Sequence, residues 1–96
     1  MARYIVLAKM TAQGIQNAKE IPQRRAAGRE AAKALGITWV DSYLTMGSYD
    51  VVIVVDAPDS EAIAKFVLQI GMRGNLSTET LRTFNDEEVD RLLAAI

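Results

Sequence analysis

The segment MGSYDVVIVV, residues 46–55, decides the fold, because it contains the most apolar strand of the chain. Every residue from position 51 to position 55 is aliphatic. Successive side chains of a strand point to opposite faces of a sheet, so both faces of this strand are apolar. A sheet face in contact with water carries polar residues at alternate positions instead. We therefore expect a strand over residues 49–56 that is covered on both sides.

The residues just before this segment predict its partner strand. Residues 37–46 alternate between two sets of side chains and form a two-faced strand, and Gly47 with Ser48 makes the turn. With two residues between the runs, we expect a hairpin. The alternation places Trp39 and Tyr43 on one face. There they either line a pocket for a planar ligand or belong to the core or to a dimer interface.

Further outward, two more strands and two helical patterns complete the domain. Strands are predicted over residues 3–10 and 75–84. A helical pattern runs from about 12 to 35; Thr11 caps its start, and Gly36 ends it. Pro22 interrupts that pattern, so we expect a kink or two consecutive helices. A further helix follows Asp59 and presents one buried stripe before Gly71 ends it; the stripe consists of Ile63, Phe66, Val67 and Ile70.

A short helix closes the chain. Asn85 and Glu88 have the spacing of a capping box, and an apolar stripe follows on one face, consisting of Val89, Leu92, Leu93 and Ile96. This stripe either contacts a second copy of the chain or folds back on its own subunit. The sequence leaves both alternatives open.

The order of elements is that of an α+β, ferredoxin-like βαββαβ domain spanning residues 1–96. In this arrangement the first and third strands are central antiparallel neighbours, and the fourth lies on the other side of the first. Two helices cover only one face of the four-stranded sheet. The doubly apolar strand therefore predicts a homodimer or a higher oligomer, with a second copy packed against the other face.

Composition excludes several classes of function. Eleven basic and twelve acidic residues leave a net charge of −1, so we expect neither a nucleic-acid nor a membrane partner. The chain contains no cysteine and no histidine, which argues against a zinc site, a haem site or a catalytic triad, and we predict no metal and no cofactor. The N-terminal apolar run is short and contains Lys9, unlike a signal peptide, and we expect a cytoplasmic protein. The basic stripe of Arg25, Arg29 and Lys33 is interpreted as a solvated helix face.

Polar side chains converge at one end of the predicted sheet. The antiparallel first and third strands bring Lys9 next to Tyr49 and Asp50, and the fourth strand begins nearby at Asn75. With the start of the long helix, this group has the chemistry to hold a carboxylate or phosphate. Structural alternatives are also open. Lys9 and Asp50 form a cross-strand ion pair worth at most about 1 kcal/mol, or Asp50 ties down the turn at Gly47.

Three blocks of sequence, taken together, resemble the GYD domain family. They are TAQGIQNAKE with the following proline and arginines (residues 11–25), TMGSYDVVIVVDAPD (45–59) and RGNLSTETLRTF (73–84). The similarity spans about residues 3–88. It implies a ferredoxin-like fold similar to the dimeric α/β barrel group, and it implies no catalytic residues. The positions that match the family motif are Gly47, Tyr49, Asp50, Gly74 and Asn75.

Two hypotheses for function follow. The first is a homo-oligomeric small-molecule-binding or regulatory domain, with a pocket between the sheet and the long helix or at the subunit boundary. The ligand-binding candidates are Tyr49, Asp50, Asn75 and Lys9. The second is a cofactor-independent isomerase or oxygenase with Asp50 as the base, and with Asn75 or Tyr49 stabilising an oxyanion. This alternative rests on analogy of fold.

Overall fold

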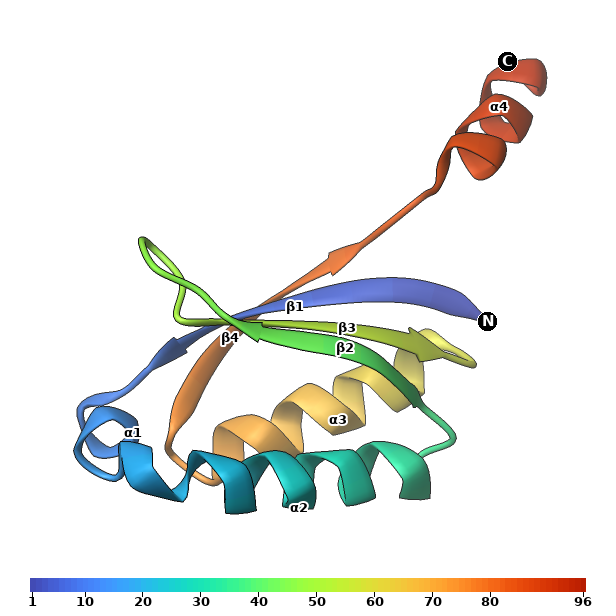
Figure 1. The fold of residues 1–96 in the computed structure, drawn as a ribbon. Coiled ribbons are helices and arrows are strands. Elements are labelled where there is room, and N and C mark those ends of the chain that lie inside the picture. Colours follow the sequence, from blue (N-terminus) through green and yellow to red (C-terminus); the bar gives the residue numbers. More distant parts are fainter.

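The computed structural model describes residues 1–96 and confirms the predicted ferredoxin-like fold. Four strands and two long helices follow one another in the predicted βαββαβ order, with additional short helical segments (Figure 1). The elements are β1 (Ala2–Met10), α1 (Ala12–Gln16), the 3-10 turn η1 (Ala18–Glu20), α2 (Ile21–Ala34), β2 (Thr38–Leu44), β3 (Val51–Ala57), α3 (Ser60–Met72), β4 (Leu76–Arg82) and α4 (Asp86–Ala94).

The sheet has the strand order β2-β3-β1-β4, and every neighbouring pair is antiparallel. As predicted, β1 and β3 are central, and β4 lies on the other side of β1. Figure 1 shows α2 and α3 side by side beneath one face of the sheet, whereas no element covers the opposite face. We call this second face the open face.

Alternate residues of the central strands build the core. Tyr4 and Val6 of β1 and Ile53 and Val55 of β3 are buried beneath α2 and α3. Phe66 of α3 is fully buried among them, as the predicted helical stripe requires. The residues between these positions belong to the open face and are only half-buried; they are Ile5, Leu7, Val52 and Val54.

The start and the end of α2 are set by a proline and a glycine identified in the sequence. Pro22 lies in the first turn of α2, where its missing N–H group costs no hydrogen bond. The helical pattern is accordingly divided into α1, η1 and α2, which confirms the expectation of consecutive helices. Gly36 follows the end of α2 with a φ of 73°, a conformation that glycine adopts without steric cost.

Two other boundaries differ from prediction. The loop between β2 and β3 spans residues 45–50 rather than two residues, because Thr45 and Tyr49 close it: the Thr45 hydroxyl donates to the Tyr49 carbonyl at 2.6 Å. Helix α3 does not end at Gly71 but continues to Met72. Glycine weakens a helix without breaking it, and the chain turns at Gly74, where φ is 79°.

A β-bulge corrects the predicted alternation of β2. Trp39 pairs with Val55, but Asp41 pairs with Val54, so Val40 is the extra residue. The bulge reverses the side-chain alternation. Trp39 therefore lies on the helix-covered face, whereas Tyr43, opposite Val52, belongs to the open face. The prediction that Trp39 and Tyr43 share one face is wrong for this reason.

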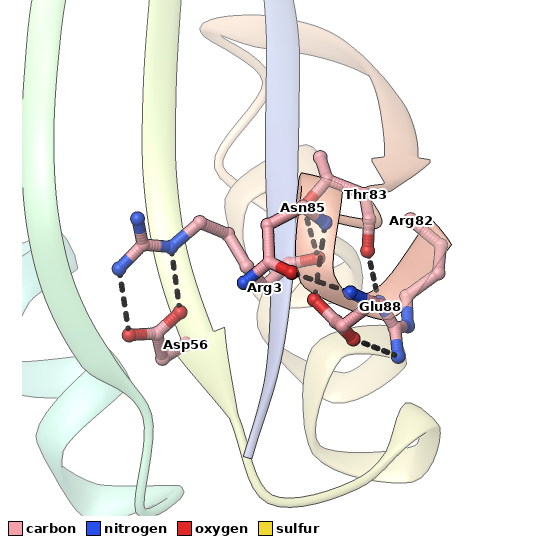
Figure 2. Close-up of polar contacts among 6 residues, drawn as sticks. All are labelled: Arg3, Asp56, Arg82, Thr83, Asn85 and Glu88. Carbon is pink, nitrogen blue, oxygen red and sulfur yellow. Dashed lines mark hydrogen bonds and ion pairs between the residues drawn. The ribbon is translucent and has the colours of Figure 1, made fainter. Parts of the chain in front are cut away.

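Helix α4 extends away from the body of the domain, on the side of the sheet opposite α2 and α3 (Figure 1). None of its residues is buried, so the alternative that it folds back on its own subunit is wrong. The predicted capping box is present between Asn85 and Glu88, and Arg82 lies 3.7 Å from the Glu88 carboxylate (Figure 2). The helix start is therefore fixed by local contacts. No helix of the chain has the length and apolar character to span a bilayer.

Candidate functional site

Asp50 extends the pairing of the two central strands beyond their last ladder residues. Its carboxylate Oδ2 accepts a hydrogen bond from the backbone N–H of Met10 at 2.7 Å, and its own N–H donates to the Ala8 carbonyl at 2.9 Å. Its carbonyl accepts from the Thr45 N–H at 2.8 Å. Asp50 thus joins the end of β1 to the loop that precedes β3.

Tyr49 lies beside Asp50 and contacts side chains of β1 and β4. Its hydroxyl donates to the Glu79 carboxylate of β4, and this bond raises the pKa of Tyr49 above its ordinary value. The ammonium of Lys9 lies 5.4 Å from the centre of the Tyr49 ring, in a cation–π arrangement. Lys9 is therefore placed over Tyr49 and makes no ion pair with Asp50.

Asn75 binds the first turn of α1. Its carbonyl accepts from the Thr11 N–H at 3.0 Å, and its side-chain oxygen accepts from the Gln13 amide at 3.1 Å. Thr11 also caps α1 by accepting from the Gly14 N–H at 3.1 Å. These donors at the helix start are thus already engaged by the protein itself.

A cavity of about 140 Å³ lies between the sheet and the two long helices, next to this polar end. Nine of its fifteen lining residues are hydrophobic, among them Met10, Ile53 and Ile70. The polar contributions come from α2, β2 and the segment that leads into β4; they are Arg24, Arg25, Ser42, Arg73 and Asn75, together with the indole of Trp39.

Two buried donors at this cavity lack a partner. The Nε atom of Arg24 and the Nε1 atom of Trp39 are inaccessible to solvent and make no hydrogen bond within the chain. Arg24 uses only its Nη2 atom, which donates to the carbonyls of Gly14 and Asn17 at 3.2 and 3.0 Å. Leaving a buried donor unsatisfied costs about 1–3 kcal/mol, so most such groups in proteins have partners.

Trp39 is held in place from three sides. Its ring meets Phe66 edge-to-face at 6.2 Å between centroids, and the guanidinium of Arg29 lies 5.5 Å from the ring centre. On α2, Gly28 faces the ring so closely that an added Cβ would lie 3.4 Å from Cζ3. The indole is therefore a rigid wall of the cavity.

The structure divides the four predicted ligand residues into two groups. Asn75 lines the cavity. Lys9, Tyr49 and Asp50 gather at the adjacent end of the sheet, as the predicted topology requires, but they do not line it. A ligand role for these three residues stays a prediction. No group of three or more aspartate, glutamate, histidine or cysteine side chains is arranged to hold a metal ion.

Sequence reasoning missed the main polar residues of the cavity. No motif in the sequence marks Arg24 or Arg73, and the prediction that Arg25 belongs to a solvated helix face misses that it lines the cavity. Helical spacing offered a signal for Arg24, because Arg24, Gly28 and Ile21 recur at three and four residues and share one face of α2. Arg73 carries no such signal, because it follows the end of α3.

Comparison with known proteins relates the chain to one family. Residues 4–93 match the family model described as GYD domain. A Thermus thermophilus protein named glutamine synthetase and cystathionine beta-lyase binding protein is 33% identical over 82 residues, which are 84% of this chain and 86% of the relative.

Two solved structures resemble the domain. The structure of TTHA0845 from Thermus thermophilus has a TM-score of 0.57 and 28% identity, and the match covers 88% of this chain and 95% of that one. The structure of MtbAldR has a TM-score of 0.69 and 14% identity, with 88% of this chain matched to 52% of that one. The fold is thus of the dimeric α/β barrel type.

Proposed function

This chain belongs to the GYD domain family, and we propose that it is a homo-oligomeric protein that binds a small molecule in the cavity between its sheet and helices and acts as a regulator. The pair of unpartnered buried donors on Arg24 and Trp39 carries the proposal. A ligand that accepts from them would remove the cost of burying them unsatisfied.

The enzymatic alternative has less support. It requires Asp50 to act as a base on a bound substrate. The Asp50 carboxylate is engaged by the Met10 N–H, and Asp50 does not line the cavity. The polar residues that do line it are arginines, a serine, an asparagine and a tryptophan, which donate hydrogen bonds or orient a ligand.

The open face supports self-association. Its centre is apolar, with Ile5 and Leu7 of β1 opposite Val54 and Val52 of β3. Charged residues of both signs flank this centre: Arg3 pairs with Asp56 at one end, and at the other end lie Lys9 of β1 and Glu79 of β4, which is opposite Leu7. A second copy presents the same apolar centre and the same mixed charges. Because α4 extends on this side of the sheet, its apolar stripe adds to the contact (Figure 1).

Binding to other proteins is the second candidate function. The relative from Thermus thermophilus is named as a binding protein for two enzymes. The exposed apolar side chains of α4 suit such a contact, since Leu92 and Leu93 are 50% and 63% exposed. Under this proposal, ligand occupancy of the cavity regulates the binding of a partner enzyme.

Native mass spectrometry tests the main proposal. We expect protein from its own source to appear as a dimer or larger assembly that carries a stoichiometric adduct, which denaturing conditions release. The variant Trp39→Phe removes one unpartnered donor and should lose most of the adduct, whereas Lys33→Gln, an exposed change on the same helix α2 that lines the cavity, should retain it. If the protein appears as a monomer, the proposed homo-oligomer is wrong. If it appears as an assembly without an adduct, the proposed small-molecule binding is wrong.

A further inference from the structure

We infer that the cavity binds a small organic anion whose body is apolar and about the size of one aromatic ring. This inference rests on the proposed function, because it names the ligand class of the same cavity. It combines the charge around the cavity, the positions of its donors and its volume.

The charge around the cavity is positive and uncompensated. Arg24, Arg25 and Arg73 line it, and no aspartate or glutamate does. The two side-chain ion pairs of the chain, Arg3–Asp56 and Arg82–Glu88, involve none of these arginines. Three guanidinium groups gather at one cavity in a chain of net charge −1. Guanidinium groups bind carboxylate and phosphate oxygens through two parallel hydrogen bonds, which favours an anion here.

The donors also favour a ligand that accepts hydrogen bonds. Arg24 Nε and Trp39 Nε1 are donors only, so neither is satisfied by a ligand that only donates. Ser42 and Asn75 offer further polar contacts at the same cavity. An anionic group with several oxygens serves these donors from one position.

The volume of the cavity limits the size of the apolar part of the ligand. A cavity of about 150 Å³ lined by apolar side chains holds one benzene molecule, and this cavity measures about 140 Å³. Its hydrophobic residues and the face of Trp39 suit an aromatic ring or a branched aliphatic chain. The part of a ligand that this volume encloses is therefore about the size of one ring.

Titration with three matched probes tests the inference. The probes are benzoate, phenyl phosphate and the neutral benzyl alcohol. The chain contains one tryptophan, Trp39, so its fluorescence reports on this cavity alone, and calorimetry gives the stoichiometry. We expect one of the two anions to bind each subunit once and to change Trp39 emission. Benzyl alcohol should bind at least about tenfold more weakly, since its neutral hydroxyl has no negative charge to pair with the guanidinium groups. The anion that binds more tightly shows whether the anionic group of the natural ligand is a carboxylate or a phosphate.

Charge variants assign the binding to the arginines. Arg73→Gln and Arg25→Gln are exposed changes that should each weaken anion binding by about ten- to hundredfold while leaving the thermal midpoint nearly unchanged. Arg24→Gln also removes the bonds to Gly14 and Asn17, so it is interpreted only if circular dichroism shows a folded chain. Lys33→Gln removes the same charge from α2 away from the cavity and should bind like the unmodified chain.

The outcomes separate this inference from the proposed function. If benzyl alcohol binds as tightly as benzoate, the anionic class is wrong, although the cavity still binds small molecules. If no probe binds but native mass spectrometry finds a bound adduct, the inferred ligand class is wrong and the proposed function stands. If no probe binds and no adduct is found, both are wrong.

Discussion

The carboxylate of Asp50 accepts the backbone hydrogen of Met10 at 2.7 Å, across 40 residues of sequence. The bond extends the pairing of β1 and β3 past the last residues of their ladder. It explains why an aspartate precedes the apolar strand: the carboxylate serves a backbone donor where no strand partner does. The end of β1 and the loop that precedes β3 are thereby held together.

Substitution of Asp50 distinguishes this structural role from a catalytic one. We expect Asp50→Ala to lower the free energy of unfolding by about 1–3 kcal/mol, because it leaves a part-buried N–H group without a partner. Asp50→Asn retains an acceptor and should cost less. Urea denaturation measures both. Equal stability of Asp50→Ala and the unmodified chain would contradict this role.

The contact between Gly14 and Asn75 tolerates no side chain. A Cβ atom at position 14 would lie 2.2 Å from the Asn75 carbonyl oxygen, which is fixed backbone. Gly14→Ala should therefore destabilise the chain by about 1–3 kcal/mol or more, despite the better helix propensity of alanine. Gly71→Ala is the matched control in α3: nothing lies within 4 Å of its Cβ position, and it should be neutral or stabilising. Similar unfolding curves for the two variants would argue against the contact.

A substitution at Gly28 should change ligand binding without lowering the stability of the fold. Its added Cβ would meet Trp39 at 3.4 Å, an ordinary contact, and alanine stabilises helix interiors by about 0.5–1 kcal/mol relative to glycine. We expect Gly28→Ala to be at least as stable as the unmodified chain. Because Gly28 lines the cavity, its new methyl group should weaken binding of the preferred anion. Paired thermal melts and calorimetric titrations test this. Unchanged affinity would mean that the ligand lies elsewhere.

Self-association through the open face can be tested by placing a charged residue on its edge strand, β4. Leu81 of β4 lies opposite Ile5 and is 43% exposed, so Leu81→Asp should preserve the fold of the subunit while opposing contact with a second copy. Analytical ultracentrifugation should show dissociation toward monomers. Leu68→Asp changes a residue of α3 that is 65% exposed, and it should leave the assembly intact. Loss of assembly in both variants, or in neither, would not fit the proposed interface.

The Arg3–Asp56 pair predicts a pH dependence of stability. Two hydrogen bonds from the Arg3 guanidinium, at 2.9 and 3.1 Å, lower the pKa of Asp56 below its ordinary value (Figure 2). A lowered pKa in the folded state means that the pair stabilises the fold above about pH 4 and loses this effect as pH falls through the folded pKa. Asp56→Asn should therefore be less stable at pH 7, and the difference should shrink in acid. The effect is small because Arg3 is exposed. A difference that is independent of pH would contradict the ion pair.

Much of the fold follows from local pattern. The apolar strands β1 and β3 and the caps at Thr11, Asp59 and Asn85 were predictable, because each depends on residues a few positions apart. The bulge at Val40 was not, since its extra residue is defined only against the partner strand. One inserted residue moved Tyr43 to the open face.

The sequence by itself determined the order of the elements, the doubly apolar strand and the gathering of Tyr49, Asp50 and Asn75 at one end of the sheet, because antiparallel topology follows from that order. Only the tertiary structure decided which groups these side chains bind. Asp50 meets Met10 and Asn75 meets Gln13 across 40 and 62 residues. It also decided that Arg24 and Arg73 share a cavity with Trp39, since helix, strand and turn meet there only through packing.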